Sequence, residues 1–405
     1  MLGLKPPSMF AKSSTVKYLL ALTAYNLAIF SLFSVVRSDI LFWLYDDKFV
    51  INNGLLHYVD FRPGYPPVGK LPYTCLYKAF GNAESIVLYH LAILDLVLII
   101  LHKLFRDLTT QQRARALVLI TALYPPLIWT ICIAHADLLA LLWLVLSIYF
   151  VKDRKPLAVG VFSGLGFLTK VYNAILLLPA LVSFKSLRER LVLMSSFLAT
   201  VLTISAPFLA LDPLMYISVY THHLLRGPSE TIFALLDGYF SHTGFLHPTY
   251  EATIYAWQFA SIYVPSNFDH FRYAWSHPQF QYVSLVLQAS FFLAFSLMIG
   301  AYRGAKALKV LSLAMLSYFT FSPLWSPVFS IPVFIMLMLA TLDVKVTHQA
   351  SILAILILVD SLHYLIWSPW LPLDVHMGLL TVVVSRAISI SLALYIVIKS
   401  RGWDQ

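Results

Sequence analysis

Charged residues are scarce in this chain, since aspartate, glutamate, lysine and arginine together make up 12% of its 405 residues. Hydrophobic residues account for 60%, and the mean hydropathy is +0.78. These values exclude an ordinary soluble protein and a disordered chain. The presence of only two cysteines, Cys75 and Cys132, excludes a disulfide-rich scaffold. The composition therefore predicts an integral membrane protein.

Continuous apolar runs of roughly 17 to 22 residues recur along the sequence, and each could cross a hydrocarbon core about 30 Å thick as a helix. A transmembrane β-barrel would instead alternate apolar and polar residues over segments of about 10. We therefore predict an all-α polytopic membrane protein with one membrane domain over residues 1–405 and about 12 spans. The spans are expected near residues 16–36, 84–103, 115–133, 136–151, 157–170, 171–184, 191–211, 282–301, 307–323, 326–342, 350–367 and 378–398.

Lysine and arginine gather in alternate connections between these runs, for example around residues 103–115, 152–155 and 185–190. The intervening connections are longer but hold fewer cations. By the positive-inside rule, both termini are predicted to face the cytoplasm. The net charge of +9 then mostly reflects the cations that set the orientation of the chain in the membrane. No nucleic-acid partner is expected, and a dedicated site for anionic lipid is the less favoured interpretation of the charge.

Two segments on the predicted outer side, residues 37–83 and 212–281, hold nine carboxylates and seven of the 13 histidines. Binding and catalytic groups concentrate in such loops on helical scaffolds. Within the first segment, residues 39–52 have amphipathic helical spacing and are predicted to lie along the membrane surface. Asn53-Gly54 should end that helix, and the GYPP turn at residues 64–67 should precede a second apolar stretch.

The order of these features resembles the first outer loop of GT-C glycosyltransferases. SDI, an aromatic-rich helix, NGLLHYVDF and GYPPVG follow one another directly after the first predicted span. Later helices of the same enzymes resemble HADLLALLWLVLSI from His135, GVFSGLGFLTKVYNAILLLPALV from Gly160 and FSPLWSPVFSIPVF from Phe321. The nearest resemblance is to the mannosyltransferases of glycosyltransferase family 87, which take sugar from polyprenyl-phosphate donors.

This resemblance covers most of the chain and implies a GT-C fold in a cell membrane, or in the endoplasmic reticulum membrane if the chain is eukaryotic. It implies transfer of a hexose, mannose in this family, with inversion, to a lipid or glycan acceptor on the outer face. The expected partners are the lipid bilayer, the polyprenyl-phosphate-linked sugar and that acceptor. The family generally works without a bound metal, so neither a metal site nor another cofactor is predicted.

A transferase of this kind needs a base that removes the proton of the acceptor hydroxyl. In the family the base is the aspartate that opens the first outer loop, and Asp39 occupies that position. Capping of the surface helix by Ser38 and Asp39 is an alternative or additional role. Asp46 and Asp47 are the rivals, as the base, as a contact to the sugar, as ligands of a divalent ion, or simply as a solvated face.

The leaving group would be a phosphate, whose charge a nearby cation should stabilise. Lys170 is the first candidate, because a lysine inside a membrane segment is costly, although it could also extend to the lipid headgroups. Arg226 and Arg272 are alternatives with bidentate geometry. Outer-side residues that could bind donor or acceptor, or else serve only structure, are Tyr65, His135, Asp137, His222 and His223.

Asp95 and Asp360 lie inside predicted spans, and His363 follows Asp360 by three residues. Such carboxylates face a cavity or a partner, and a proton-coupled transporter would use them as well. A multi-pass secondary transporter or lipid flippase is therefore the alternative function, although no internal repeat is evident. A scaffold subunit of a glycan-assembly complex is a third. Cys75 and Cys132 both fall near the outer side, where a disulfide could form.

Overall fold

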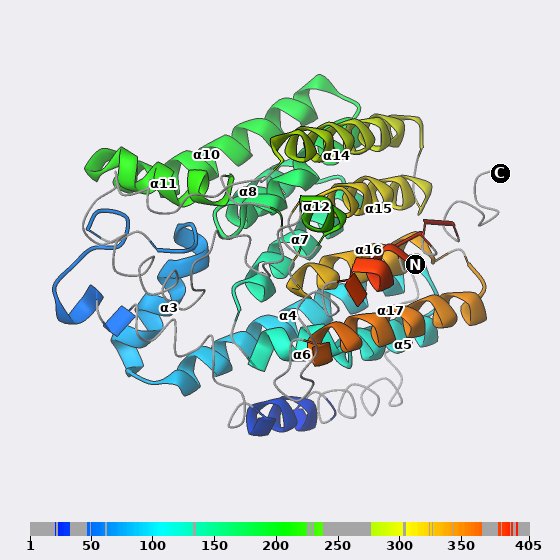
Figure 1. Ribbon diagram of the computed structural model, residues 1–405, viewed down its shortest axis with the longest axis horizontal. Coiled ribbons are helices and arrows are strands. Elements are labelled where there is room, and N and C mark those ends of the chain that lie inside the picture. Colours follow the sequence, from blue (N-terminus) through cyan, green and yellow to red (C-terminus); the bar gives the residue numbers. More distant parts are fainter. Residues whose placement is uncertain are drawn as a thin grey trace, which may run out of the picture.

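The computed structural model describes residues 21, 23–32, 47–48, 50–60, 63–132, 135–224, 228, 231–237, 277–302, 305–323, 325, 327–342, 344–366, 380–381, 383–388, 390–391 and 394–395. Within these ranges the regular elements are helices and no β-strand occurs (Figure 1). The predicted all-α membrane fold is thereby confirmed.

The helices occur in the following order along the chain. A helical segment at Thr23–Leu32 comes first. The later elements are α3 (Pro67–Phe80), α4 (Ala83–Leu108), α5 (Gln111–Ala122), α6 (Pro125–Cys132), α7 (Asp137–Lys152), α8 (Pro156–Phe167), η1 (Val171–Leu176), α9 (Leu177–Ser183), α10 (Leu187–Leu211), α11 (Pro213–Leu224), α12 (Ile232–Asp237), α14 (Pro278–Met298), η3 (Ile299–Ala301), α15 (Ala305–Thr320), η4 (Pro327–Phe329), α16 (Ser330–Ala340) and α17 (Val346–Ile366).

Three helices of the described part are long and apolar enough to cross a membrane: α4, α10 and Gln279–Ala301. The pair α5 and α6, bent by 51°, would add a fourth if it forms one span. Several shorter apolar helices pack between them. The chain is thus an integral, multi-pass membrane protein, while the count of about 12 spans and the cytoplasmic placement of the termini stay predictions.

The centre of the bundle is built from α4, α7 and α16. Every residue of α16 is buried, as are most residues of α7. By contrast, α10 lies at one edge of the bundle (Figure 1) and exposes apolar side chains such as Leu198 and Leu202. Such a surface suits a hydrocarbon environment, in which no water penalises exposed leucine.

Helices α8 and α10 approach each other closely along a glycine seam. A Cβ atom on Gly160 would lie 1.9 Å from Ser196 Oγ, and one on Gly164 would lie 2.9 Å from Thr200 Cβ. The missing side chains allow the two backbones to come together, as small residues do in membrane helix pairs. Helix α8 is therefore fixed against the long α10.

The α8–α9 hairpin is short. Helix α8 has 12 residues, which gives about 18 Å of length against a hydrocarbon core of about 30 Å. Its turn, residues 168–170, meets the beginning of α3. The Leu168 carbonyl accepts hydrogen bonds from the backbone N–H groups of Val68 (2.9 Å) and Gly69 (3.2 Å), and a Cβ on Gly69 would lie 2.6 Å from the Thr169 carbonyl oxygen. The start of α3, within the 37–83 segment, therefore packs against the hairpin turn.

The described part of the 37–83 segment follows the predicted order. Residues 50–52 are helical, Gly54 has a φ of +66°, and α3 covers the predicted second apolar stretch. The positive φ at Gly54 suits a residue without Cβ at a helix end. Cys75 and Cys132 are both free, so the disulfide considered from the sequence is not formed.

Candidate functional site

Asp137 organises a buried cluster of polar side chains at the first residue of α7. Only 2% of its surface is exposed. One carboxylate oxygen accepts a hydrogen bond from Tyr172 (2.9 Å), and the other contacts the Lys170 ammonium and His135 Nδ1. The start of a helix also favours a negative charge. Burial of this carboxylate is thus compensated by a cation and by hydrogen bonds.

His135 connects this cluster to the 37–83 segment. Its Nε2 lies 3.0 Å from the Tyr65 hydroxyl, and the two rings meet edge to face. The backbone carbonyl of His135 lies 3.3 Å from His90 Nε2, which in turn is 3.0 Å from the Tyr73 hydroxyl. The turn before α7 is therefore held by α3 and α4 as well as by Tyr65.

The Lys170 ammonium lies among aromatic rings. Its Nζ is 5.3 Å from the centroid of Tyr65, 5.9 Å from that of Tyr172 and 5.7 Å from that of Phe329. The side chain is 17% exposed. A cation in such a poorly solvated setting interacts more strongly with an anion than it would in water. The cluster of Tyr65, His135, Asp137, Lys170 and Tyr172 is called the Lys170 cluster below.

A second buried cluster surrounds Asp47, which is fully enclosed. Oxygen Oδ1 of Asp47 lies 2.9 Å from His57 Nε2, 2.8 Å from Thr74 Oγ1 and 3.2 Å from Lys70 Nζ. Lys70 is fully buried as well. Among the residues described, the other carboxylate oxygen of Asp47 has no hydrogen-bond partner. This Asp47 cluster ties the helical segment before Asn53 to α3.

The surroundings of Asp47 set its charge. Burial raises the pKa of the Asp47 carboxyl, but the Lys70 ammonium and the hydrogen bonds from His57 and Thr74 outweigh burial and hold that pKa below its ordinary value. Burial lowers the pKa of His57, and the nearby Lys70 adds to this effect, although the hydrogen bond to Asp47 opposes it. An enclosed carboxylate with a lowered pKa is a weak base, so the geometry favours a structural role for Asp47.

The loop between the two clusters is anchored by Tyr58. Its hydroxyl donates a hydrogen bond to the Tyr65 carbonyl (2.8 Å). Its ring is fully buried and lies 4.7 Å from Phe208 of α10 and 5.9 Å from Tyr216 of α11 by ring centroids. The position of Tyr65 over Lys170 thus depends on α10 and α11, which lie beside α3 at one end of the bundle (Figure 1).

The structure brings Tyr65, His135, Asp137 and Lys170 together from among the site residues expected from the sequence. Asp47 lies in the separate Asp47 cluster. Four candidates fall outside the described residues: Asp39, Asp46, Arg226 and Arg272. Backbone helix is described for His222 and His223 on α11, but not the placement of their side chains. The roles proposed for all of these residues stay predictions.

Sequence reasoning missed His57, Lys70, Thr74 and Tyr172 as members of these clusters. A signal existed for Lys70, which lies in an apolar stretch just as Lys170 does, and a lysine there is costly unless it has a partner. Nothing in the spacing marked Tyr172 among the 23 tyrosines. Its role follows only from the packing of η1 against the start of α7.

The carboxylates inside the predicted spans have partners within the bundle. Both oxygens of Asp95 lie 3.0 Å from the Asn26 amide nitrogen, and Asp360 accepts a hydrogen bond from the Tyr124 hydroxyl. The expectation that they face a partner is confirmed. The side chain of His363 lies in a part of α17 whose side chains are not described. In the described ranges, no group of three His, Cys, Asp or Glu side chains is placed to hold a metal ion.

Comparison with known proteins gives the class of this polytopic helical protein. The family model described as Glycosyltransferase family 87 matches residues 64–327, more than half of the chain, and this range contains the whole Lys170 cluster. The chain therefore belongs to glycosyltransferase family 87. It is a membrane glycosyltransferase, as the resemblance to GT-C enzymes implied, which removes the transporter and scaffold alternatives.

A solved structure to which the chain is similar is the crystal structure of ArnT from Cupriavidus metallidurans bound to undecaprenyl phosphate. The TM-score is 0.45 at 13% sequence identity, and the alignment covers 95% of this chain and 78% of that chain. No curated protein matches the chain.

Proposed function

We propose that the chain transfers a hexose, mannose, from a polyprenyl-phosphate-linked donor to a lipid or glycan acceptor at the outer face of the membrane. The observation that carries this proposal is the Lys170 cluster, in which the buried Asp137 pairs with the partly exposed Lys170 beneath the 37–83 segment and inside the range that matches the family. The cluster lies where a short membrane hairpin turns, and a donor carried on a lipid can reach a site at that depth.

Lys170 is proposed to stabilise the phosphate that leaves. The phosphate gains negative charge as its bond to the anomeric carbon breaks, and a preorganised cation in a poorly solvated site lowers the energy of that transition state. In the cluster, Asp137 holds the ammonium in place. Because His135 and Tyr172 also contact Asp137, this carboxylate keeps partners when Lys170 turns toward the donor. His222, His223, Arg226 and Arg272 stay proposed contacts to the donor or acceptor.

Asp39 is proposed as the base, on the family position alone. The acceptor oxygen would attack the anomeric carbon, the carbon–oxygen bond to the phosphate would break, and the acceptor proton would pass to Asp39. Attack opposite the leaving phosphate inverts the anomeric centre. Since Asp47 is enclosed and paired, Asp46 is the stronger rival for the base. No resident metal or other cofactor is part of this proposal.

The experiment is transfer of radiolabelled sugar from polyprenyl-phosphate mannose into membrane lipids or lipid-linked glycans, with the purified chain in nanodiscs. Polyprenyl-phosphate glucose serves as the competing donor. We expect transfer from the mannose donor, and a loss of about 100-fold in Lys170→Gln, since removal of one preorganised group at a developing anion costs about this much. Asp39→Asn should abolish transfer while the protein stays folded.

Lys78→Gln is the matched control, because Lys78 is an exposed lysine near the end of α3. Its transfer rate should equal that of the wild type. Preference for the glucose donor would overturn the assignment of mannose. Full activity of Lys170→Gln would remove Lys170 from the reaction, and full activity of Asp39→Asn would move the base to Asp46 or Asp47.

A further inference from the structure

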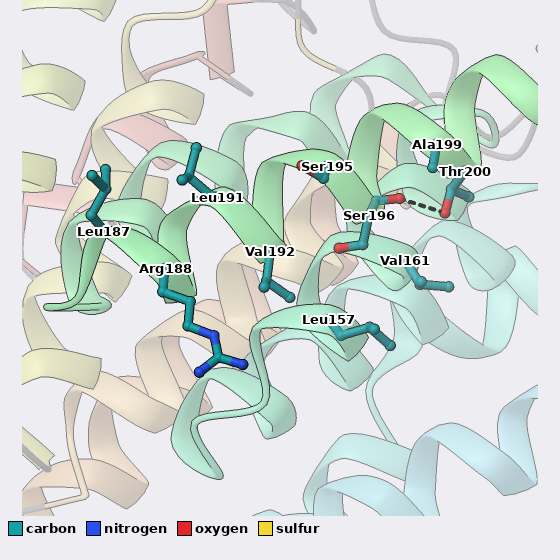
Figure 2. Close-up of a pocket in the computed structure, with 10 residues that line it drawn as sticks. All are labelled: Leu157, Val161, Leu187, Arg188, Leu191, Val192, Ser195, Ser196, Ala199 and Thr200. Atoms are coloured by element: carbon teal, nitrogen blue, oxygen red, sulfur yellow. Dashed lines mark hydrogen bonds between the residues drawn. The ribbon is translucent and has the colours of Figure 1, made fainter.

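A groove runs along α8 and α10 on the edge of the bundle (Figure 2), and its lining contains no residue of the Lys170 cluster. Its volume is about 780 Å³. Apolar side chains form most of its surface, and its lining includes Leu157, Val161, Arg188, Val192, Ser195 and Thr200. The residues of α10 that line the groove beside α8 include the small Ser195, Ser196, Ala199 and Thr200. Their short side chains leave the space between the two helices open.

The groove has the length of one membrane leaflet. Arg188 marks one end and Thr200 the other (Figure 2). Twelve residues of α-helix separate them, or about 18 Å, which is close to half of a hydrocarbon core about 30 Å thick. Helix α10 has 25 residues and is longer than the core, so its first turn reaches the headgroup level. An occupant therefore lies in a single leaflet.

The headgroup end of the groove carries a cation without a partner. Arg188 is exposed, and among the described residues it has no hydrogen-bond or ion-pair partner. Lys152 and Arg190 differ in this respect. The ammonium of Lys152 is paired with Asp107 (2.5 Å), and the guanidinium of Arg190 donates to the Phe184 carbonyl (2.7 Å). A guanidinium binds phosphate with two parallel hydrogen bonds.

We propose that this groove binds an anionic glycerophospholipid, with the phosphate on Arg188 and one acyl chain along the apolar lining toward Thr200. The N-terminal ends of α8 and α10 lie at the same end of the groove as Arg188. Their positive dipole ends favour an anion there as well. A lipid in this position would stabilise the position of α8. The opposite end of α8 leads to the hairpin turn that carries Lys170.

Native mass spectrometry of the purified chain tests the proposal, with phosphatidylglycerol and phosphatidylcholine as probes at equal concentration. The wild type should retain phosphatidylglycerol about tenfold more strongly, since a charge-assisted hydrogen bond supports a difference of this size. Arg188→Gln should lose that preference. Arg115→Gln is the matched control, because Arg115 is an exposed arginine on α5, and it should behave as the wild type.

A second variant tests the apolar part without changing charge. Ala199 lines the groove and is exposed, so Ala199→Leu should fill the space and weaken retention of both lipids. Equal retention of the two lipids by the wild type would overturn the proposal, as would equal loss in Arg188→Gln and Arg115→Gln. Loss of polyprenyl-phosphate retention in Arg188→Gln, with retention of phosphatidylglycerol unchanged, would replace the proposed occupant.

Discussion

Lys170 and Asp137 form an ion pair that joins the turn of the α8–α9 hairpin to the first residue of α7. The two residues are 33 positions apart in the sequence. Asp137 has almost no exposed surface, whereas Lys170 keeps part of its surface open. This pair holds two membrane segments together. It also leaves the Lys170 ammonium partly accessible while Asp137 is enclosed.

Asp137→Asn should destabilise the protein strongly, because it leaves the Lys170 ammonium without its buried counter-charge. Loss of one partner of a buried pair costs ~3–5 kcal/mol. Asp107→Asn is the control, since Asp107 pairs with the partly exposed Lys152, and such pairs contribute less than ~1 kcal/mol. Thermal unfolding in detergent measures both. Similar midpoints for the two variants would show that the buried pair does not stabilise the fold.

Gly69→Ala should separate α3 from the hairpin turn. The new Cβ would lie 2.6 Å from the Thr169 carbonyl oxygen, which is backbone and cannot turn away. We expect a loss of ~1–3 kcal/mol in stability and a lower transfer rate, because Tyr65 would shift from Lys170. In Gly300→Ala the nearest atom is a Val182 side-chain carbon at 3.2 Å, which can adjust. Equal transfer by the two variants would contradict the prediction.

The Asp47 cluster should make stability depend on pH. The pKa of His57 is lowered in the folded protein, so His57 contributes stability that is present above its unfolded value of about 6.5 and is lost as pH falls below it. Asp47, whose pKa is also lowered, adds a loss at more acidic pH, below about 4. Thermal midpoints in detergent from pH 8 to pH 5 isolate the histidine contribution.

His57→Gln should flatten the profile between pH 6.5 and pH 5. His348→Gln is the matched control, because His348 is an exposed histidine on α17. It should keep the wild-type profile. A profile of His57→Gln that parallels the wild type over this window would refute the assignment of His57.

Tyr58→Phe removes one hydroxyl and keeps the ring among Phe208 and Tyr216. The hydrogen bond to the Tyr65 carbonyl is lost, at a cost of about 1 kcal/mol. Tyr58→Ala also empties the ring's buried position and should cost ~3–5 kcal/mol. Chemical denaturation in detergent separates the two. Equal losses would mean that the hydroxyl, and not the ring, anchors the loop.

Much of the fold could be predicted from the sequence, because the length and hydropathy of an apolar run are local properties. The breaks near residues 170 and 184 were located in this way: η1–α9 lies within the span expected at 171–184, and α8 begins one residue before the span expected at 157–170. The 12-residue length of α8 was not evident, since its end depends on the contact of residues 168–170 with α3. Lys170 was singled out by its cost in a membrane segment, and Asp137 by its position on the predicted outer side.

The sequence by itself determined a helical membrane protein and its resemblance to GT-C glycosyltransferases. It also marked several charged residues whose side chains are energetically costly in a membrane segment. Only the tertiary structure decided which of them meet. Tyr65 reaches His135 across 70 positions, and Asp47 is enclosed by His57, Lys70 and Thr74. Such contacts depend on how distant helices pack, and the spacing of residues along one segment does not encode the neighbours that another segment brings.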